Sequence, residues 1–236
     1  MTILILRPQP GADATARRAR ALGLDAIAAP LFHIEPLAWD APDPAAYDAV
    51  LMTSANAARF GGEALSRYHH LPLFAVGSAT EAAARAAGFP EILAGEGDGA
   101  AILDRAVAQG KSRLLHLVGR DHVDFRHPRA LVDRRIVYAS EAVQHLPLPA
   151  RQAIEDGTIA LLHSARAARL LAELIDREAL DRSRVAIVAI SDTARAAAGA
   201  GWLRSLAAPV PDNDALLAIA ARLCDQDVYQ DREDQP

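Results

Sequence analysis

Short apolar runs alternate with longer Ala-rich segments along most of this chain. A short, continuous apolar run is typical of a strand buried on both faces of a sheet. Such runs predict strands at 3–6, 48–52, 73–76, 91–94, 113–118, 158–162, 184–190 and 207–210. The Ala-rich segments predict helices at 11–22, 55–65, 80–87, 99–108, 165–175, 193–200 and 213–224, and 225–236 is expected to form a frayed acidic tail. Strands that alternate with helices indicate an α/β fold with parallel sheets.

Four of the predicted strands end in a cluster of Ser or Thr residues that a helix follows. The clusters begin at Thr53, Ser78, Ser164 and Ser191. Capping of the first backbone N–H groups is the ordinary role of such hydroxyls. The free N–H groups and the positive end of the helix dipole also suit an anion. Because the clusters come in two pairs, they favour two similar halves that bind a ligand with several negative groups.

Two extended apolar segments, 31–38 and 135–143, lead directly into no predicted helix. They can pair as a two-stranded hinge between a discontinuous α/β domain, residues 1–35 and 143–236, and an inserted α/β domain, residues 36–142. Each domain then holds one pair of hydroxyl clusters. Ligands of open α/β sheets bind at the carboxyl ends of the strands. We therefore expect the site in a cleft between the two domains.

The composition narrows the classes of function. A formal net charge of −5 argues against a general nucleic-acid surface. No apolar run approaches the roughly 20 residues of a membrane span, and the first residues lack the basic start of a signal peptide. Cys224 is the single cysteine, which excludes an internal disulfide. These features predict a cytoplasmic protein that binds neither nucleic acid nor a membrane.

Sequence motifs of several common enzyme classes are missing. The segment Gly77-Ser78-Ala79-Thr80 lacks the Gly-Lys-Ser/Thr of a Walker loop, and no dinucleotide fingerprint follows the first strand. No Gly-x-Ser-x-Gly elbow supports a serine hydrolase. The eight histidines show no metal-ligand spacing with cysteine or carboxylate residues, so no metal site is expected.

Tyr138 lies in the second extended segment. A tyrosine there is ordinarily a half-buried structural residue. A phenol that faces a cleft can also donate a proton to a leaving hydroxyl. Gly77 and Gly119 each end a predicted strand where the backbone must turn sharply.

The order and spacing of several short pieces resemble the uroporphyrinogen-III synthase family over nearly the whole chain. The pieces are Leu6-Arg7-Pro8, Thr53-Ser54-Ala55-Asn56-Ala57, Val76-Gly77-Ser78-Ala79-Thr80, Gly119-Arg120-Asp121, Val137-Tyr138, His163-Ser164-Ala165-Arg166-Ala167 and Ile190-Ser191-Asp192-Thr193-Ala194. The resemblance implies two α/β domains joined by a two-stranded ladder. It implies cyclisation of hydroxymethylbilane to uroporphyrinogen III, with loss of water and inversion of ring D. Neither a metal nor an organic cofactor is implied.

The resemblance also implies roles for individual residues. Tyr138 corresponds to the family tyrosine proposed to assist loss of the terminal hydroxyl. The eight carboxylates of the substrate would bind to hydroxyls, backbone amides and one guanidinium. The substrate-binding residues are then Arg7, Thr53, Ser54, Asn56, Gly77, Ser78, Thr80, Gly119, Ser164, Ala165, Ser191 and Thr193. The expected partner is this small-molecule substrate, and the expected oligomeric state is a monomer.

The chain departs from the family pattern in one segment. After Gly119-Arg120-Asp121 we expect a fuller helix and a Gly-bearing turn, but Asp124-Phe125-Arg126-His127-Pro128 interrupts this segment. Two other functions stay open. A non-catalytic two-domain module for a small polyanion, such as a degenerate synthase homologue, would keep the hydroxyl clusters without needing Tyr138. A phosphosugar-binding enzyme would use similar turns, but no acid/base pair is evident.

Overall fold

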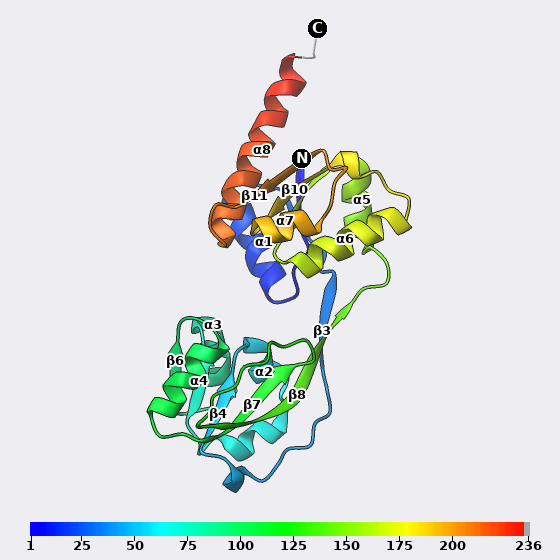
Figure 1. The fold of residues 1–236 in the computed structure, drawn as a ribbon. Helices are drawn as coiled ribbons and strands as arrows, with labels where there is room; N and C mark the ends of the chain where they lie inside the picture. Colours follow the sequence, from blue (N-terminus) through cyan, green and yellow to red (C-terminus); the bar gives the residue numbers. More distant parts are fainter. Residues whose placement is uncertain (234–236) are drawn as a thin grey trace. The chain divides into compact units, whose positions relative to one another are not determined.

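The computed structural model describes the backbone of residues 1–233 and the side chains of residues 1–225. The chain divides into two compact units (Figure 1): unit 1 is Met1–His33 with Ala142–Pro236, and unit 2 is Ile34–Glu141. Each unit contains one β-sheet covered by helices. That the two units are independent domains with boundaries at 35/36 and 142/143 stays a prediction.

Unit 1 is built on a five-stranded sheet in the order β11-β10-β9-β1-β2, and all neighbouring strands pair in parallel. The strands are β1 (Thr2–Ile5), β2 (Ala26–Ala28), β9 (Thr158–Leu162), β10 (Val185–Ala189) and β11 (Arg204–Ala207). The helices are α1 (Gly11–Ala21), α5 (Leu148–Asp156), α6 (Ala165–Arg177), α7 (Asp192–Ala197) and α8 (Asn213–Glu233). The apolar runs predict the buried central strands correctly, because those strands are covered on both faces.

Alternate residues of β1 point to opposite faces of the unit 1 sheet. Leu4 packs in the core under α5, α6 and α7, whereas Ile3 and Ile5 pack in the core under α1 and α8. From β1 the chain moves outward to β2, and from β9 it moves the other way to β10 and β11. The direction therefore reverses between the adjacent strands β1 and β9, and such a reversal is the usual ligand position in an open α/β sheet.

Unit 2 is built on a six-stranded sheet in the order β3-β8-β7-β4-β5-β6. The strands are β3 (Phe32–Pro36), β4 (Ala49–Met52), β5 (Leu73–Val76), β6 (Ile92–Gly95), β7 (Arg113–Gly119) and β8 (Leu131–Ala142). Its helices are α2 (Ala55–Phe60), α3 (Ser78–Ala86) and α4 (Gly99–Ala108). The pairing of β3 with β8 confirms that the two extended apolar segments form a ladder. In that ladder the backbone N–H of Leu37 donates to the carbonyl of Val137 at 2.9 Å.

The unit 2 sheet, like that of unit 1, has one point at which the direction of strand addition reverses. The chain runs outward from β4 to β5 and β6, and in the other direction from β7 to β8. The reversal falls between β4 and β7, which pair in parallel with Leu51 opposite His116. Helix α4 packs on one face of this sheet, and α2 and α3 pack on the other.

Several element ends differ from those predicted. Helices α2 and α7 have only six residues each, because glycines with positive φ follow them, Gly62 at +72° and Gly199 at +74°. Strand β11 ends at Ala207, where the sequence predicts a strand to begin. Helix α8 continues to Glu233, into the segment expected to be frayed, and the last part of that segment, 234–236, lies outside the described residues. Among residues 1–233, no helix combines the length and hydrophobicity that a membrane span requires.

Candidate active site

Unit 2 contains a pocket of about 720 Å³ at the carboxyl ends of β4 and β7. These are the two strands between which the topology reverses, as expected for a ligand site. Four residues predicted from the sequence line it: Thr53, Ser54, Gly119 and Tyr138. The remaining wall consists mainly of the loop after β7 and the start of α4. The fold thus brings these four predicted residues together from three separate segments of unit 2.

Tyr138 and Gly119 are paired positions on the parallel strands β8 and β7, at an irregularity of the ladder. The aromatic ring lies against the Gly119 backbone, because a Cβ built on Gly119 would come within 2.6 Å of the Tyr138 Cζ atom and 2.9 Å of its hydroxyl oxygen. Tyr138 is half-buried, and its hydroxyl makes no hydrogen bond with any of the described residues. The pocket therefore holds a phenol whose donor is free for a ligand.

A buried histidine supports the Thr53 side of the pocket. His116 is fully buried in β7, and its Nε2 lies 3.4 Å from Thr53 Oγ1. Burial, with smaller contributions from Arg134 and His122, lowers the pKa of His116 to about 3. The imidazole is therefore neutral, and its Nδ1 has no hydrogen-bond partner among the described residues. Sequence reasoning missed His116, whose only signal is a polar residue inside an apolar strand.

The loop after β7 replaces the helix that the family pattern leads one to expect. Phe125 anchors it: a Cβ built on Gly99 would come within 2.1 Å of the Phe125 ring, and that ring lies 5.0 Å from the His116 ring. Arg134 lies over the same ring and pairs with Asp124 at 3.2 Å. The interruption seen in the sequence is thus a packed wall of the pocket.

In this loop the His122 side chain also faces the polar edge of the pocket. Its Nδ1 lies 2.9 Å from the Gly119 carbonyl oxygen, and its Nε2 lies 3.6 Å from Asp124 Oδ1. The Nδ1 atom of His122 is therefore within hydrogen-bond distance of the Gly119 carbonyl oxygen.

Three of the four hydroxyl clusters cap helices as predicted. Ser54 Oγ accepts from the Asn56 N–H at 3.2 Å, Ser164 Oγ from the Ala167 N–H at 3.1 Å, and Ser191 Oγ from the Ala194 N–H at 3.2 Å. Because the oxygens are used in this way, the free backbone N–H groups are what these turns can offer an anion. Helices α2 and α7 have only six residues, so their dipoles add little to the attraction of an anion. The Ser164 turn, at the start of the 13-residue α6, is therefore the most favourable anion site of the three.

The fourth cluster is built differently from the prediction. Helix α3 begins at Ser78 and is capped by Gly77, which has φ of +76° and supplies no side-chain cap. Thr80 is therefore inside the helix on the face of Ala83 and Ala84, and it is only 3 % exposed. The Thr80 side chain thus packs inside unit 2, and its role in substrate binding stays a prediction. Ser78 is exposed at the helix start.

The other predicted residues lie at the expected ends of strands and helices. The Asn56 Oδ1 accepts from Arg59 at 3.3 Å in α2, and Ala165 is the first residue of α6. Thr193 lies exposed in α7 and does not cap it. The described residues include no cluster of three His, Cys, Asp or Glu side chains that could hold a metal ion.

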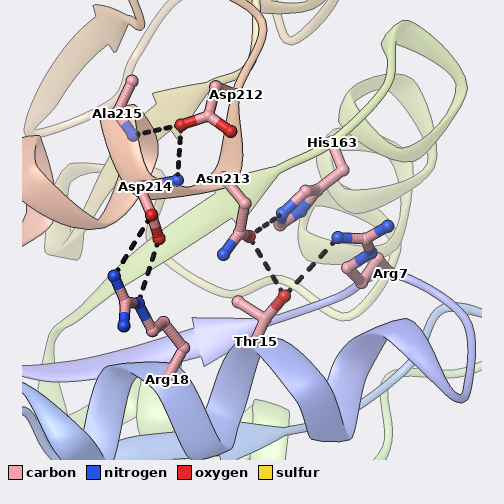
Figure 2. Close-up of polar contacts among 8 residues, drawn as sticks. All are labelled: Arg7, Thr15, Arg18, His163, Asp212, Asn213, Asp214 and Ala215. Carbon is pink, nitrogen blue, oxygen red and sulfur yellow. Dashed lines mark hydrogen bonds and ion pairs between the residues drawn. The ribbon is translucent and has the colours of Figure 1, made fainter. Parts of the chain in front are cut away.

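Arg7 belongs to a polar cluster at the reversal point of unit 1 (Figure 2). Its Nη1 lies 3.5 Å from Thr15 Oγ1, which donates to Asn213 Oδ1 at 3.0 Å. His163, the residue after β9, places its Nε2 3.1 Å from the same Asn213 oxygen. Thr15, Asn213 and His163 did not emerge from the sequence as site residues, because these contacts join segments up to 198 positions apart.

Comparison with known proteins agrees with this architecture. Residues 13–218 match the family model described as uroporphyrinogen-III synthase HemD. The crystal structure of uroporphyrinogen-III synthetase from Helicobacter pylori is 16 % identical, with a TM-score of 0.64 over 94 % of this chain and 99 % of that one. The uroporphyrinogen III synthase structure from Thermus thermophilus is 18 % identical over 97 % of this chain and 100 % of that one, with a TM-score of 0.42. A search of curated protein sequences found no match.

Proposed function

The chain belongs to the uroporphyrinogen-III synthase family, and we propose that it cyclises hydroxymethylbilane to uroporphyrinogen III with the pocket of unit 2 as the place where water is lost. The observation that carries this function is the family match over residues 13–218. Such an enzyme is a cyclising lyase of heme biosynthesis. The reaction needs a proton for the leaving hydroxyl and control over which carbon of ring D is joined.

Tyr138 is the proposed proton donor. Its phenol stands in the pocket with a free O–H, seated against Gly119. When the C–O bond of the terminal hydroxymethyl group breaks, the oxygen leaves as water with the phenol proton. The proton that ring D releases after ring closure restores the phenol. The atoms balance without a metal or an organic cofactor.

The substrate carboxylates are the proposed ligands of the strand-to-helix turns. In unit 2 the Thr53-Ser54 turn offers backbone N–H groups beside Tyr138. In unit 1 the start of α6 at Ser164 and Ala165 offers N–H groups, and Arg7 offers a guanidinium. Because the turns bind mainly through backbone groups, single hydroxyl substitutions should weaken binding only modestly.

Selection between products is the second part of the proposal. Without guidance the bilane closes to isomer I. An enzyme that holds both ends of the bilane in one geometry favours the closure that inverts ring D. The interdomain cleft, the monomeric state, the cytoplasmic location and the absence of nucleic-acid or membrane partners stay predictions.

A product assay tests this function. Purified protein is mixed with freshly made hydroxymethylbilane, the products are oxidised, and the porphyrin isomers are separated. We expect isomer III, formed faster than in a control with heat-denatured protein. Isomer I alone at the spontaneous rate would contradict the synthase function. If the bilane then bound without turnover, the non-catalytic polyanion-binding module would be the better description.

A further inference from the structure

Arg7 is a half-buried cation that lacks an internal counter-ion. Its only hydrogen bond among the described residues is the 3.5 Å contact with Thr15, and no carboxylate of these residues pairs with it. The guanidinium folds over the first residue of α1, where a Cβ built on Gly11 would come within 2.6 Å of Arg7 Nε. Burial lowers the pKa of Arg7. A desolvated cation of this kind is stabilised when an anion binds beside it.

Two carboxylates beside this cluster, Asp212 and Asp214, are engaged elsewhere (Figure 2). Asp214 pairs with Arg18, whose Nε and Nη2 lie 3.1 Å and 3.2 Å from its two oxygens. Asp212 accepts from the backbone N–H groups of Asp214 at 2.9 Å and Ala215 at 3.2 Å. The start of α8 thus contributes two acidic side chains, neither of which neutralises Arg7.

Neutral groups hold Arg7 instead. Since the Thr15 hydroxyl hydrogen is directed to Asn213 Oδ1, the Thr15 oxygen presents its lone pairs to Arg7. The same Asn213 oxygen lies 3.1 Å from His163 Nε2, which fits an imidazole protonated at that nitrogen. Burial first, and the nearby Arg7 charge as a weaker cause, lower the pKa of His163 and keep its ring neutral. Thr15 is only 2 % exposed, so the network is fixed by packing.

The cluster of Arg7, Thr15, His163 and Asn213 lies where the sheet topology favours a ligand. Arg7 and His163 follow the adjacent strands β1 and β9, between which the direction of the sheet reverses. Thr15 lies on α1 and Asn213 begins α8. A cation at the carboxyl ends of central parallel strands is well placed for an anionic ligand.

We propose that Thr15, Asn213 and His163 are positioning residues that hold the Arg7 guanidinium ready for the substrate carboxylate proposed above as its ligand. The identity of the anion as an acetate or propionate side chain of hydroxymethylbilane rests on the proposed function. The positioning residues act through Arg7 and leave it free of an internal carboxylate. They are expected to affect substrate affinity and to leave the chemical step unchanged.

The test compares kcat and KM in a double-mutant cycle of Arg7→Gln and Thr15→Val. Valine keeps the shape of the buried threonine and removes its hydroxyl. We expect R7Q to raise KM about 10- to 100-fold and T15V to raise it about three- to tenfold, with kcat within about twofold of the wild type. In the R7Q background, T15V should add nothing, because its effect passes through Arg7. Thr15→Ser should keep the wild-type KM, and Arg17→Gln, which removes an exposed charge from the same helix, should not change it.

An unchanged KM in T15V, or an equal effect of T15V with and without Arg7, would overturn the inference. Thermal unfolding of each variant checks that it folds. A second measurement is independent of turnover: isothermal titration with uroporphyrin III, the stable oxidised octacarboxylate of the product. R7Q should bind it at least about tenfold more weakly than the wild type. Equal affinity, or no binding by the wild type, would overturn the carboxylate site. A wild type that binds uroporphyrin III through Arg7 but forms no isomer III would contradict the proposed function alone.

Discussion

The ring of Tyr138 rests on the backbone of Gly119, so close that a Cβ on Gly119 would lie 2.6 Å from the Tyr138 Cζ atom. Both residues line the unit 2 pocket, and they are paired positions on neighbouring parallel strands. The absence of a side chain at Gly119 is therefore what allows the phenol to occupy this position.

Gly119→Ala is expected to push the Tyr138 ring out of its position. The methyl group cannot be accommodated without movement of the ring, so kcat for isomer III formation should fall at least about tenfold while KM changes little. Tyr138→Ala removes the clash. In the Y138A background, G119A should therefore cost no further stability or activity, as a double-mutant cycle would show. Additive losses would mean that Gly119 serves some other purpose.

His116 makes the stability of unit 2 sensitive to acid. Its folded pKa of about 3 lies below the ordinary value of 6.5, so the unfolded chain takes up the proton first as the pH falls. The stabilisation is complete above about pH 6.5 and is lost progressively toward pH 3. Between about pH 7 and pH 5 the free energy of unfolding of unit 2 should fall by ~2 kcal/mol. Asp48, whose pKa is lowered by hydrogen bonds from Ser112 and Arg113, adds a loss only at more acidic pH.

Trp39 allows this loss to be measured in unit 2 alone. The chain has two tryptophans, Trp39 in unit 2 and Trp202 in unit 1. In a Trp202→Phe background, urea unfolding followed by Trp39 fluorescence reports on unit 2. In the His116→Leu variant, the fall in the free energy of unfolding between pH 7 and pH 5 should be smaller by ~2 kcal/mol. An unchanged loss would show that His116 does not stay neutral in the folded protein.

Ser164→Ala should affect stability more than catalysis. The substitution removes the cap of α6 and should lower the free energy of unfolding of unit 1 by about 1 kcal/mol, measured through Trp202. Its backbone N–H groups persist, so KM should rise by no more than about threefold. Ser205→Ala is the matched control in unit 1, because Ser205 is exposed in β11. A loss of activity in S164A that far exceeds its loss of stability would mean that the hydroxyl itself binds the substrate.

Phe125→Ala should release the loop that forms one wall of the pocket. The ring packs on Gly99 and on the buried His116, and Arg134 lies over it. Its removal should make 120–130 more susceptible to proteolysis and raise KM several-fold. Phe125→Leu, which keeps an apolar side chain, should lie between the wild type and F125A. Equal proteolysis of all three proteins would show that the loop is held by other contacts.

The sequence predicts those features that arise from local patterns. Continuous apolar runs mark the central strands, and Ser54, Ser164 and Ser191 cap their helices because each directly precedes a helical segment. The burial of Thr80 could not be predicted in this way. Gly77 starts α3 two residues earlier than predicted, and the helical repeat then turns Thr80 toward the sheet with Ala83 and Ala84.

Long-range polar contacts cannot be predicted from local patterns. Thr15 and Asn213 are 198 positions apart and meet only because α1 and α8 cover the same face of the unit 1 sheet. His116 and His163 resemble isolated polar residues in or beside apolar strands. Their roles come from what packs around them, which one sequence does not contain.

The rate of isomer III formation by the wild type and by Tyr138→Phe, measured side by side on hydroxymethylbilane, tests the central claim most directly. The wild type should form uroporphyrinogen III, and Y138F should do so about 10²-fold more slowly with a similar KM, because only the phenol O–H has been removed. A wild type that yields isomer I alone would contradict the synthase function, and a Y138F variant as fast as the wild type would contradict the role of Tyr138.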